Sequence, residues 1–382
     1  MTSITTIKFT RERLLAILSL VSPYLNAKNK ALNFSIQQGN LKVFTSDFVD
    51  GGSIMLSVPL GKKSKDMDWL AINGQQFKEM VGLSDGLIEI GFDTKISTVT
   101  MQFPGSKSEF RAATLSVAIS SVKFNEPGKV FTIKGRDFNI IATITEAASD
   151  EESRPTLMGV YVAPTKDELE TAAADGFILS YATFKPGKSD NASGATYSVD
   201  AIQRVKRSLK PADDEELKVQ VGKSGMTITT QRGDVDVTLH APIVSSKFVD
   251  YKTILNIQSS VKAAIPTDHL DRMIKVLRAM EGHVYFQIIG GSFWYFIKSE
   301  RGSRVESMAL NGIKGESPLM HFQLSTIQNV LKACAANGSL EMIFPKASNS
   351  PLQLNGKASA IAMPLVCDLE ESPFKNYQPT MM

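Results

Sequence analysis

The chain has 382 residues, of which 43% are hydrophobic and 21% are charged. This composition is ordinary for globular proteins, so it excludes a largely disordered chain, and the length suffices for two or three domains. The formal net charge of +3 is too small to identify a nucleic-acid ligand, because the placement of basic residues matters more than such an excess.

Amphipathic helices occur in pairs, and the pair recurs three times at a spacing of about 125 residues, which predicts a tandem of similar domains. The first helix of each pair has mostly apolar residues at helical spacing. They are Leu14, Leu15, Leu18 and Val21; Phe138, Ile141, Thr145 and Ala148; Leu270, Met273, Leu277 and Met280. The second helix, about 60 residues later, has the same pattern: Phe77, Met80 and Val81; Ile202, Val205 and Leu209; Ile327, Val330, Leu331 and Cys334. An alternating strand follows each second helix, at 87–90, 217–221 and 340–344.

The repeat predicts an α+β fold with three domains, at residues 1–125, 126–257 and 258–366. The linkers are expected at 125–128 and 256–260, where turn-forming residues lie between a completed strand and the next unit. In the first domain we expect strands near 32–43, 52–58, 87–92 and 97–103. Residues 367–382 contain no periodic pattern, and this C-terminal tail is expected to be loosely ordered.

The two cysteines, Cys334 and Cys367, cannot form a disulfide framework, and we expect both to be reduced thiols. The N-terminus lacks the basic and then apolar pattern of a signal peptide. No apolar run approaches the roughly 18 residues of a membrane span. These features predict a soluble, cytoplasmic protein.

Five stretches carry a resemblance to a known family, and they occur in the family's order: 131–134, which leads into a helix, and then 147–160, 174–179, 248–255 and 361–365. The sequence resembles the bacterial DNA polymerase III beta subunit, the beta sliding clamp, from about Thr5 to Val366. Ala174, Phe177 and Ile178 replace the family's threonine, histidine and arginine, and Val249 and Thr253 replace its proline and arginine. The sequence is therefore identified as a divergent member of this family.

The resemblance implies three tandem DNA-clamp domains that form half of a ring, with helices lining the inside and antiparallel sheets outside. Two chains would then join head to tail as a homodimer, and we expect edge strands at 97–103 and 303–310 to pair across the joint. Such a ring is a non-enzymatic processivity factor in DNA replication that needs no cofactor and no metal. It encircles double-stranded DNA without reading sequence and tethers the DNA polymerase, and an ATP-driven clamp loader places it on DNA.

The resemblance also implies a groove between the second and third domains that receives short peptides of polymerases and clamp-loader subunits. The residues carried over to its lining are Leu157, Ala174, Gly176, Leu179, Val249, Thr253, Ile254, Ile361, Met363, Pro364 and Leu365. An apolar groove can bind an extended peptide by burying a few anchor side chains. The alternative is that residues such as Leu157 and Leu179 belong to an ordinary core. The changes at 174, 177, 178 and 253 predict a preference for more apolar peptides.

Basic residues beside the apolar faces of several helices suggest a surface that contacts DNA phosphates. The residues expected to face DNA are Lys28, Lys30, Arg136, Arg204, Lys206, Arg207, Lys210, Arg272, Lys275 and Arg278. The alternative is a simple solvated helix face, and nearby acidic residues such as Asp200 and Asp271 dilute the pattern.

Other functions are less well supported by the sequence. Gly222-Lys223-Ser224 lacks the earlier glycine of a phosphate-binding loop, and the four histidines lack metal-ligand spacing. The run Asp150-Glu151-Glu152 is better interpreted as a solvated loop than as a metal site. A non-catalytic structural or assembly protein built from tandem sheets remains the alternative to a clamp.

Overall fold

The structure is a computed structural model. It describes residues 4–47, 51–61, 64–104, 108–115, 124, 126–187, 190, 192–310, 312–313, 315–334, 340–367, 369 and 372–374. Asn125 of the first expected linker and most of the C-terminal tail lie outside this set. Within the described residues, no helix has the length and apolar character needed to cross a membrane.

The same order of elements occurs three times along the chain. The first repeat contains β1 (Ile4–Thr10), α1 (Arg11–Val21), η1 (Ser22–Tyr24), β2 (Ala31–Gln37), β3 (Asn40–Ser46), β4 (Ser53–Pro59), β5 (Met67–Asn73), α2 (Gly74–Gly82), β6 (Leu87–Asp93), β7 (Thr98–Gln102) and β8 (Glu109–Ala113). The second contains β9 (Lys129–Lys134), α3 (Gly135–Ile144), η2 (Thr145–Ala147), η3 (Pro155–Leu157), β10 (Gly159–Pro164), β11 (Leu169–Ala174), β12 (Ile178–Phe184), β13 (Ala195–Ser198), α4 (Val199–Leu209), β14 (Glu216–Val221), β15 (Gly225–Arg232) and β16 (Val235–Ser245). After η4 (Lys252–Leu255), the third contains β17 (Ser259–Ile265), α5 (Thr267–Arg278), β18 (His283–Ile289), β19 (Ser292–Ser299), β20 (Gly302–Ala309), β21 (Met320–Gln323), α6 (Leu324–Ala333), β22 (Leu340–Pro345), β23 (Leu352–Asn355) and β24 (Ser359–Ala362).

Each repeat has two sheets with the same strand order. The first sheets are β5-β2-β3-β4, β13-β10-β11-β12 and β21-β18-β19-β20. The second sheets are β1-β6-β7-β8, β9-β14-β15-β16 and β17-β22-β23-β24. In every second sheet the opening strand pairs antiparallel with the strand that follows the second helix. The predicted α+β fold and its threefold repetition are therefore confirmed.

The chain divides into two compact units that do not coincide with the repeats. The first unit contains Met1–Phe138, Pro186–Ala192 and Tyr197–Ile243, and the second contains Asn139–Lys185, Ser193–Thr196 and Val244–Met382. The domain boundaries expected near 125, 257 and 366 remain predictions.

Adjacent repeats are joined by antiparallel strand pairing, and each joint lies within one unit. In the first unit β4 pairs with β16, from Ser53 opposite His240 to Ser57 opposite Asp236. In the second unit β12 pairs with β24 over four residue pairs, including Leu179 opposite Ile361. Both joints therefore follow one rule. The third strand in chain order of one repeat's first sheet, β4 or β12, pairs with the last strand of the next repeat's second sheet, β16 or β24.

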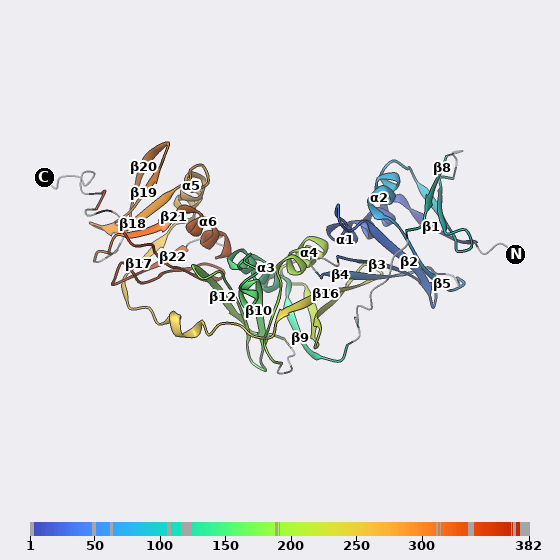
Figure 1. The fold of residues 1–382 in the computed structure, drawn as a ribbon, viewed down its shortest axis with the longest axis horizontal. Helices are drawn as coiled ribbons and strands as arrows, with labels where there is room; N and C mark the ends of the chain where they lie inside the picture. The colour runs from blue at the N-terminus through green and yellow to red at the C-terminus, as the bar shows by residue number, and fades with distance from the viewer. Residues whose placement is uncertain are drawn as a thin grey trace. The chain divides into compact units, whose positions relative to one another are not determined.

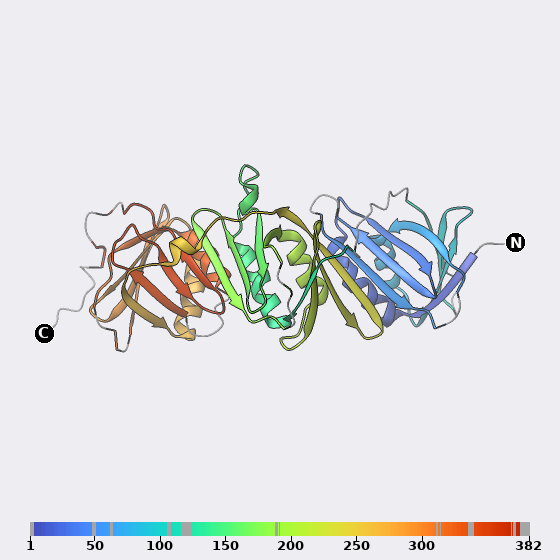
Figure 2. The same ribbon diagram turned by 90° about the horizontal axis from the view of Figure 1, so that it is seen from below.

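Polar side chains cap the start of α1, α2 and α4. Thr10 accepts a hydrogen bond from the backbone N–H of Arg13 at 3.3 Å, and Asn73 and Ser198 cap α2 and α4 in the same way. The apolar faces of the helices then pack on the sheets. In the first unit, Phe77 of α2 lies 5.5 Å from the ring of Phe34 on β2. Figure 1 shows α1 and α2 beside the blue strands, and Figure 2 shows these strands in front of the blue helices.

Two expectations were wrong. The expected edge strand at 97–103 corresponds to β7, which lies between β6 and β8, so the outer strand is β8. The described part of the C-terminal tail is also packed rather than loose. Phe374 is fully buried with its ring 5.8 Å from that of Trp294, and Ser372 Oγ donates a hydrogen bond to Gln287 at 2.6 Å.

Candidate partner-peptide site and basic helices

A buried apolar cluster lies at the β12–β24 joint of the second unit. Its buried members are Leu157, Ala172, Ala174, Leu179, Tyr251 and Ile361. Tyr181, Phe248, Leu255 and Ile257 are partly buried and pack against it. The strands supply one wall, because Leu179 and Ile361 are directly opposite each other on β12 and β24. The segment 248–257, which connects β16 to β17, supplies another.

Exposed apolar side chains surround this cluster. Phe177, Val249, Ile254 and Met363 are all exposed, although large hydrophobic residues are usually buried. Phe177 and Met363 are neighbours, since the backbone N–H of Met363 donates to the carbonyl of Phe177 at 2.8 Å. Val249 and Ile254 belong to the segment that packs on the cluster. An exposed apolar rim around a buried apolar floor is typical of a protein interaction site.

Turns and ion pairs hold the rim in place. Asp175 Oδ1 accepts hydrogen bonds from the backbone N–H groups of Phe177 and Ile178, each at 2.7 Å. Gly176, between Asp175 and Phe177, has φ of +101°, a conformation that favours glycine. On the other side Lys252 Nζ lies 2.6 Å from Glu170 Oε1. Burial, and then the charge of Glu170, raise the pKa of Tyr251, so its phenol stays protonated.

The structure brings together four of the eleven sequence-predicted pocket residues, Leu157, Ala174, Leu179 and Ile361, as the floor. Gly176, Val249, Thr253, Ile254 and Met363 lie in the flanking segments, and Pro364 and Leu365 follow β24 directly. Sequence reasoning missed Tyr251 and Phe248 as site residues. Both stand in the stretch 248–251 that carried part of the family resemblance, so a signal for them was present.

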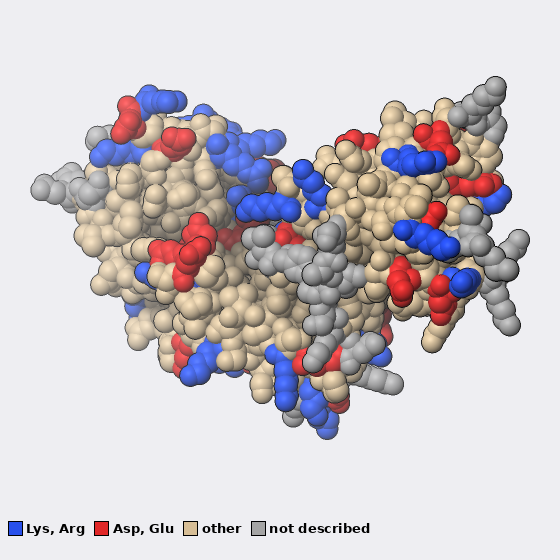
Figure 3. Space-filling view, turned by 45° about the vertical axis from the view of Figure 1, so that its right-hand side comes forward, with Lys and Arg blue, Asp and Glu red and all other residues tan. Residues whose placement is uncertain are grey.

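Most of the basic residues expected to face DNA are on the surface. The exposed ones are Lys28, Lys30, Arg136, Arg207, Lys210, Arg272, Lys275 and Arg278, and Lys206 is half-buried. Arg207 lies in the last turn of α4, where Lys210 caps the helix end, and Lys275 and Arg278 lie in the last turn of α5. Figure 3 shows basic side chains interspersed with acidic ones on the viewed face.

Arg204 does not face solvent, and its assignment to a DNA-facing surface was wrong. Its side chain is only 7% exposed, and its Nη2 lies 2.8 Å from Oδ2 of Asp47, which is 1% exposed. The guanidinium also lies 6.0 Å from the ring centre of Tyr24. Arg204 therefore joins α4 of the second repeat to the connection after β3 in the first.

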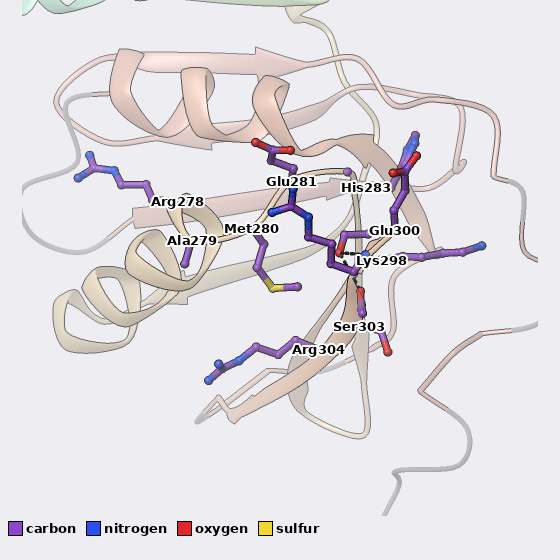
Figure 4. Close-up of a pocket in the computed structure, with 13 residues that line it drawn as sticks. Arg278, Ala279, Met280, Glu281, His283, Lys298, Glu300, Ser303 and Arg304 are labelled. Carbon is purple, nitrogen blue, oxygen red and sulfur yellow. Dashed lines mark hydrogen bonds between the residues drawn. The ribbon is translucent and has the colours of Figure 1, made fainter.

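The C-terminal end of α5 borders an open, basic cavity of about 1160 Å³. Arg278, Lys298, Arg301 and Arg304 line it together with Glu281 and Glu300. Figure 4 shows Arg278 and Arg304 extending to one side of this cavity and Lys298 to the other. Arg304 is also paired with Glu306, at 2.5 Å. Exposed basic side chains of this kind suit phosphate contacts without base readout.

Comparison with solved structures identifies the class of fold. The chain superposes on the beta subunit of DNA polymerase III from Thermotoga maritima with a TM-score of 0.79 and 20% identity, covering 95% of this chain and 100% of that one. It superposes on the beta subunit from Pseudomonas aeruginosa with a TM-score of 0.82 and 16% identity, covering 94% and 100%. The protein therefore has the sliding-clamp fold.

The sequence itself supplies the more specific finding. Residues 133–253 match the family model of the DNA polymerase III beta subunit, central domain. None of the curated proteins compared matches the chain significantly. The middle of the chain thus resembles the central domain of the beta subunit in sequence, and the chain as a whole has the fold of a DNA polymerase III beta-type clamp.

Proposed function

We propose that this protein is a DNA sliding clamp, a non-catalytic processivity factor that encircles duplex DNA in the cytoplasm and tethers a replicative polymerase. The observation that carries the proposal is the repeated joint. At both joints the third strand of a first sheet pairs with the last strand of the next repeat's second sheet. Applied once more, this rule leaves β20 of the third repeat and β8 of the first as a matching pair.

Two copies of the chain would satisfy that pair head to tail. Among the described strands, β8 pairs only with β7 and β20 pairs only with β19, so each offers an open edge. Pairing β20 of one protomer with β8 of its partner, at two symmetric joints, would give a closed homodimer and leave neither edge open. Phe110, half-buried on β8, would lie within this interface.

The oligomeric state tests this assembly. Light scattering of the wild-type protein should give twice the chain mass of 41.7 kDa, and the Phe110→Asp variant should give the mass of one chain. Ile96→Asp is the matched control, because Ile96 is an exposed apolar residue outside β8. A wild-type monomer or trimer at micromolar concentration would contradict the homodimer, as would a dimeric Phe110→Asp variant.

We propose that the protein binds DNA through the solvated basic residues of its helices. Contacts of this kind are independent of sequence and weaken steeply with salt. Replacing Arg207 and Lys210 with alanine should reduce duplex binding and flatten its salt dependence by roughly one phosphate contact per residue. After loading by an ATP-driven clamp loader, the protein should remain on circular DNA and slide off the same DNA when it is linearised. Equal retention on both forms would refute encirclement.

The apolar cluster at the β12–β24 joint is the proposed binding site for short peptides of the polymerase and clamp-loader subunits. Tethering through such a site raises the local concentration of polymerase at the primer end. Met363→Asp and Ile254→Asp should abolish binding of a labelled peptide containing glutamine and leucine, because they place charge in an apolar rim. Leu83→Asp is the control, since Leu83 is more exposed and lies in the first unit. Unchanged affinity in both rim variants would refute the assignment.

A further inference from the structure

A second groove lies on the sheet surface at the β4–β16 joint. The cavity has a volume of about 720 Å³, within the roughly 300–1,000 Å³ that is usual for binding pockets. Its lining includes Met55 of β4, Trp69 of β5 and Asp236 of β16, together with Phe124 and Glu126 from the connection between β8 and β9. All of these residues belong to the first unit. We refer to this cavity as the β4–β16 groove.

The groove occupies the same place in the repeat as the candidate peptide site. The β12–β24 site is formed by the third strand of a first sheet, the last strand of a second sheet and the connection between repeats. The β4–β16 groove is formed by the corresponding strands and by the corresponding connection. On its floor Met55 is opposite Thr238 and Ser57 is opposite Asp236, where the other site has Leu179 opposite Ile361.

Aromatic side chains make the apolar part of the groove. Trp69 and Phe124 each pack against Phe44, with ring centres 6.1 and 6.0 Å away and edge-to-face geometry. Phe44 is buried, whereas Trp69, Phe124 and Met55 are only half-buried and border the open volume. Aromatic residues and methionine are enriched at protein interfaces relative to the rest of the surface.

The charged residues of the groove distinguish it from the β12–β24 site. Glu126 is held in place, since its Oε2 accepts a hydrogen bond from the backbone N–H of Ser224 at 2.9 Å and another from its hydroxyl. Asp236 is exposed, and its Oδ1 accepts from Gln231 at 2.8 Å. Among the described lining residues the one amine is that of Lys42, which donates to Ser57 at 2.8 Å. The described part of the lining therefore carries a net negative charge.

The β12–β24 site has charged neighbours of both signs, and its basic residues are paired with acidic ones. Arg154 lies 2.9 Å from Glu151, and Lys252 on the other side of the cluster lies 2.6 Å from Glu170. Complementary charge selects partners and suppresses wrong ones. One site has an apolar floor and the other has Glu126 and Asp236 in its lining, so the two should bind different segments.

We propose that the β4–β16 groove is a second docking site that binds an extended segment of a partner protein in which an aromatic or aliphatic anchor stands beside lysine or arginine. The anchor enters the space bordered by Met55, Trp69 and Phe124. The basic residue pairs with Glu126 or Asp236. This site goes beyond the proposed tethering of a polymerase at the β12–β24 joint, because it gives one chain two independent positions for protein segments.

Peptide selection tests the proposal. A phage-displayed library of random dodecapeptides is selected on the full-length Met363→Asp variant, in which the β12–β24 site is disabled. The enriched sequences should combine a large apolar residue with an adjacent basic one. Synthetic copies should bind Met363→Asp saturably and lose about tenfold or more in affinity when Asp236→Lys is added, with weaker binding at high salt.

The control is Asp213→Lys, which makes the same charge change at an exposed position of the first unit away from the groove. It should leave the affinity unchanged. No enrichment, enrichment of acidic peptides, or binding that is indifferent to Asp236→Lys would overturn the proposal. Because the wild-type dimer, DNA retention and β12–β24 peptide assays do not involve Asp236, failure of this site is distinguishable from failure of the clamp function.

Discussion

The buried ion pair between Arg204 and Asp47 gives a quantitative test of the first unit's structure. Nη2 of Arg204 and Oδ2 of Asp47 are 2.8 Å apart, and the same oxygen accepts a hydrogen bond from Asn26 at 2.7 Å. Arg204→Met keeps the length of the side chain but leaves the Asp47 carboxylate buried without its cation. Removing one partner of a buried pair typically costs about 3–5 kcal/mol of unfolding free energy. Arg204→Met combined with Asp47→Asn should recover most of this loss, since no charge is then left buried.

Tryptophan fluorescence can report this loss for the first unit alone. The chain has two tryptophans, Trp69 in the first unit and Trp294 in the second. In a Trp294→Phe background, urea unfolding followed by Trp69 should show the midpoint of Arg204→Met lowered by about 2 M, for a slope of roughly 2 kcal/mol per M. The control Arg207→Met, on an exposed position of the same helix, should stay within about 0.5 kcal/mol.

Two results would refute the reasoning about Arg204. A loss below about 1 kcal/mol in Arg204→Met would mean that the pair is not buried as described. Reduced duplex binding with unchanged stability would return Arg204 to the DNA-facing residues. The double substitution separates the two roles, because it should restore stability without restoring a positive charge.

Three further predictions concern single residues. Burial raises the pKa of Cys334 to about 12, so its thiol stays protonated at pH 8. Cys334 should therefore react with a thiol reagent such as DTNB only after unfolding, and rapid reaction of Cys334 in the folded protein would contradict its burial. Gly176→Ala should lower the unfolding free energy by about 1–3 kcal/mol, measured by urea unfolding of the second unit, because Gly176 has φ of +101° and an added Cβ would lie 2.9 Å from Nη1 of Arg154. Phe374→Ala should shift the emission of Trp294 to longer wavelength in a Trp69→Phe background, since it exposes the indole; an unchanged spectrum would show that the tail does not cover it.

Periodicity predicted the helices well because their buried faces are local in sequence. In α4 the apolar spacing identified Ile202, Val205 and Leu209, all of which are buried. The same spacing could not identify Arg204 as buried. Its counter-ion, Asp47, lies more than a hundred and fifty residues earlier, so only the tertiary fold brings the two charges together.

Short strands were harder to predict than helices. β8 has the sequence Glu-Phe-Arg-Ala-Ala and carries little apolar alternation, so the outer strand of its sheet was assigned to β7. The packing of the tail was hidden for a similar reason. Phe374 is an isolated aromatic residue in a non-periodic segment, and its partner Trp294 is on β19. At the β12–β24 joint, the family resemblance grouped Leu157, Leu179 and Ile361, which the structure places in one buried cluster, whereas periodicity alone left Leu157 and Leu179 as possible core residues.

The two joints show how one backbone arrangement can acquire different chemistry. Strand pairing fixes which positions face the groove, because side chains directly opposite each other share a face of the sheet. Those positions are Leu179 and Ile361 at one joint but Ser57 and Asp236 at the other. Hydrogen bonds of the backbone maintain the joint in both cases, so the groove residues can change without loss of the pairing. A partner that binds one groove should therefore be rejected by the other. Met363→Asp should leave the affinity of a β4–β16 peptide unchanged, and Asp236→Lys should leave that of a β12–β24 peptide unchanged, since the variants act on different units.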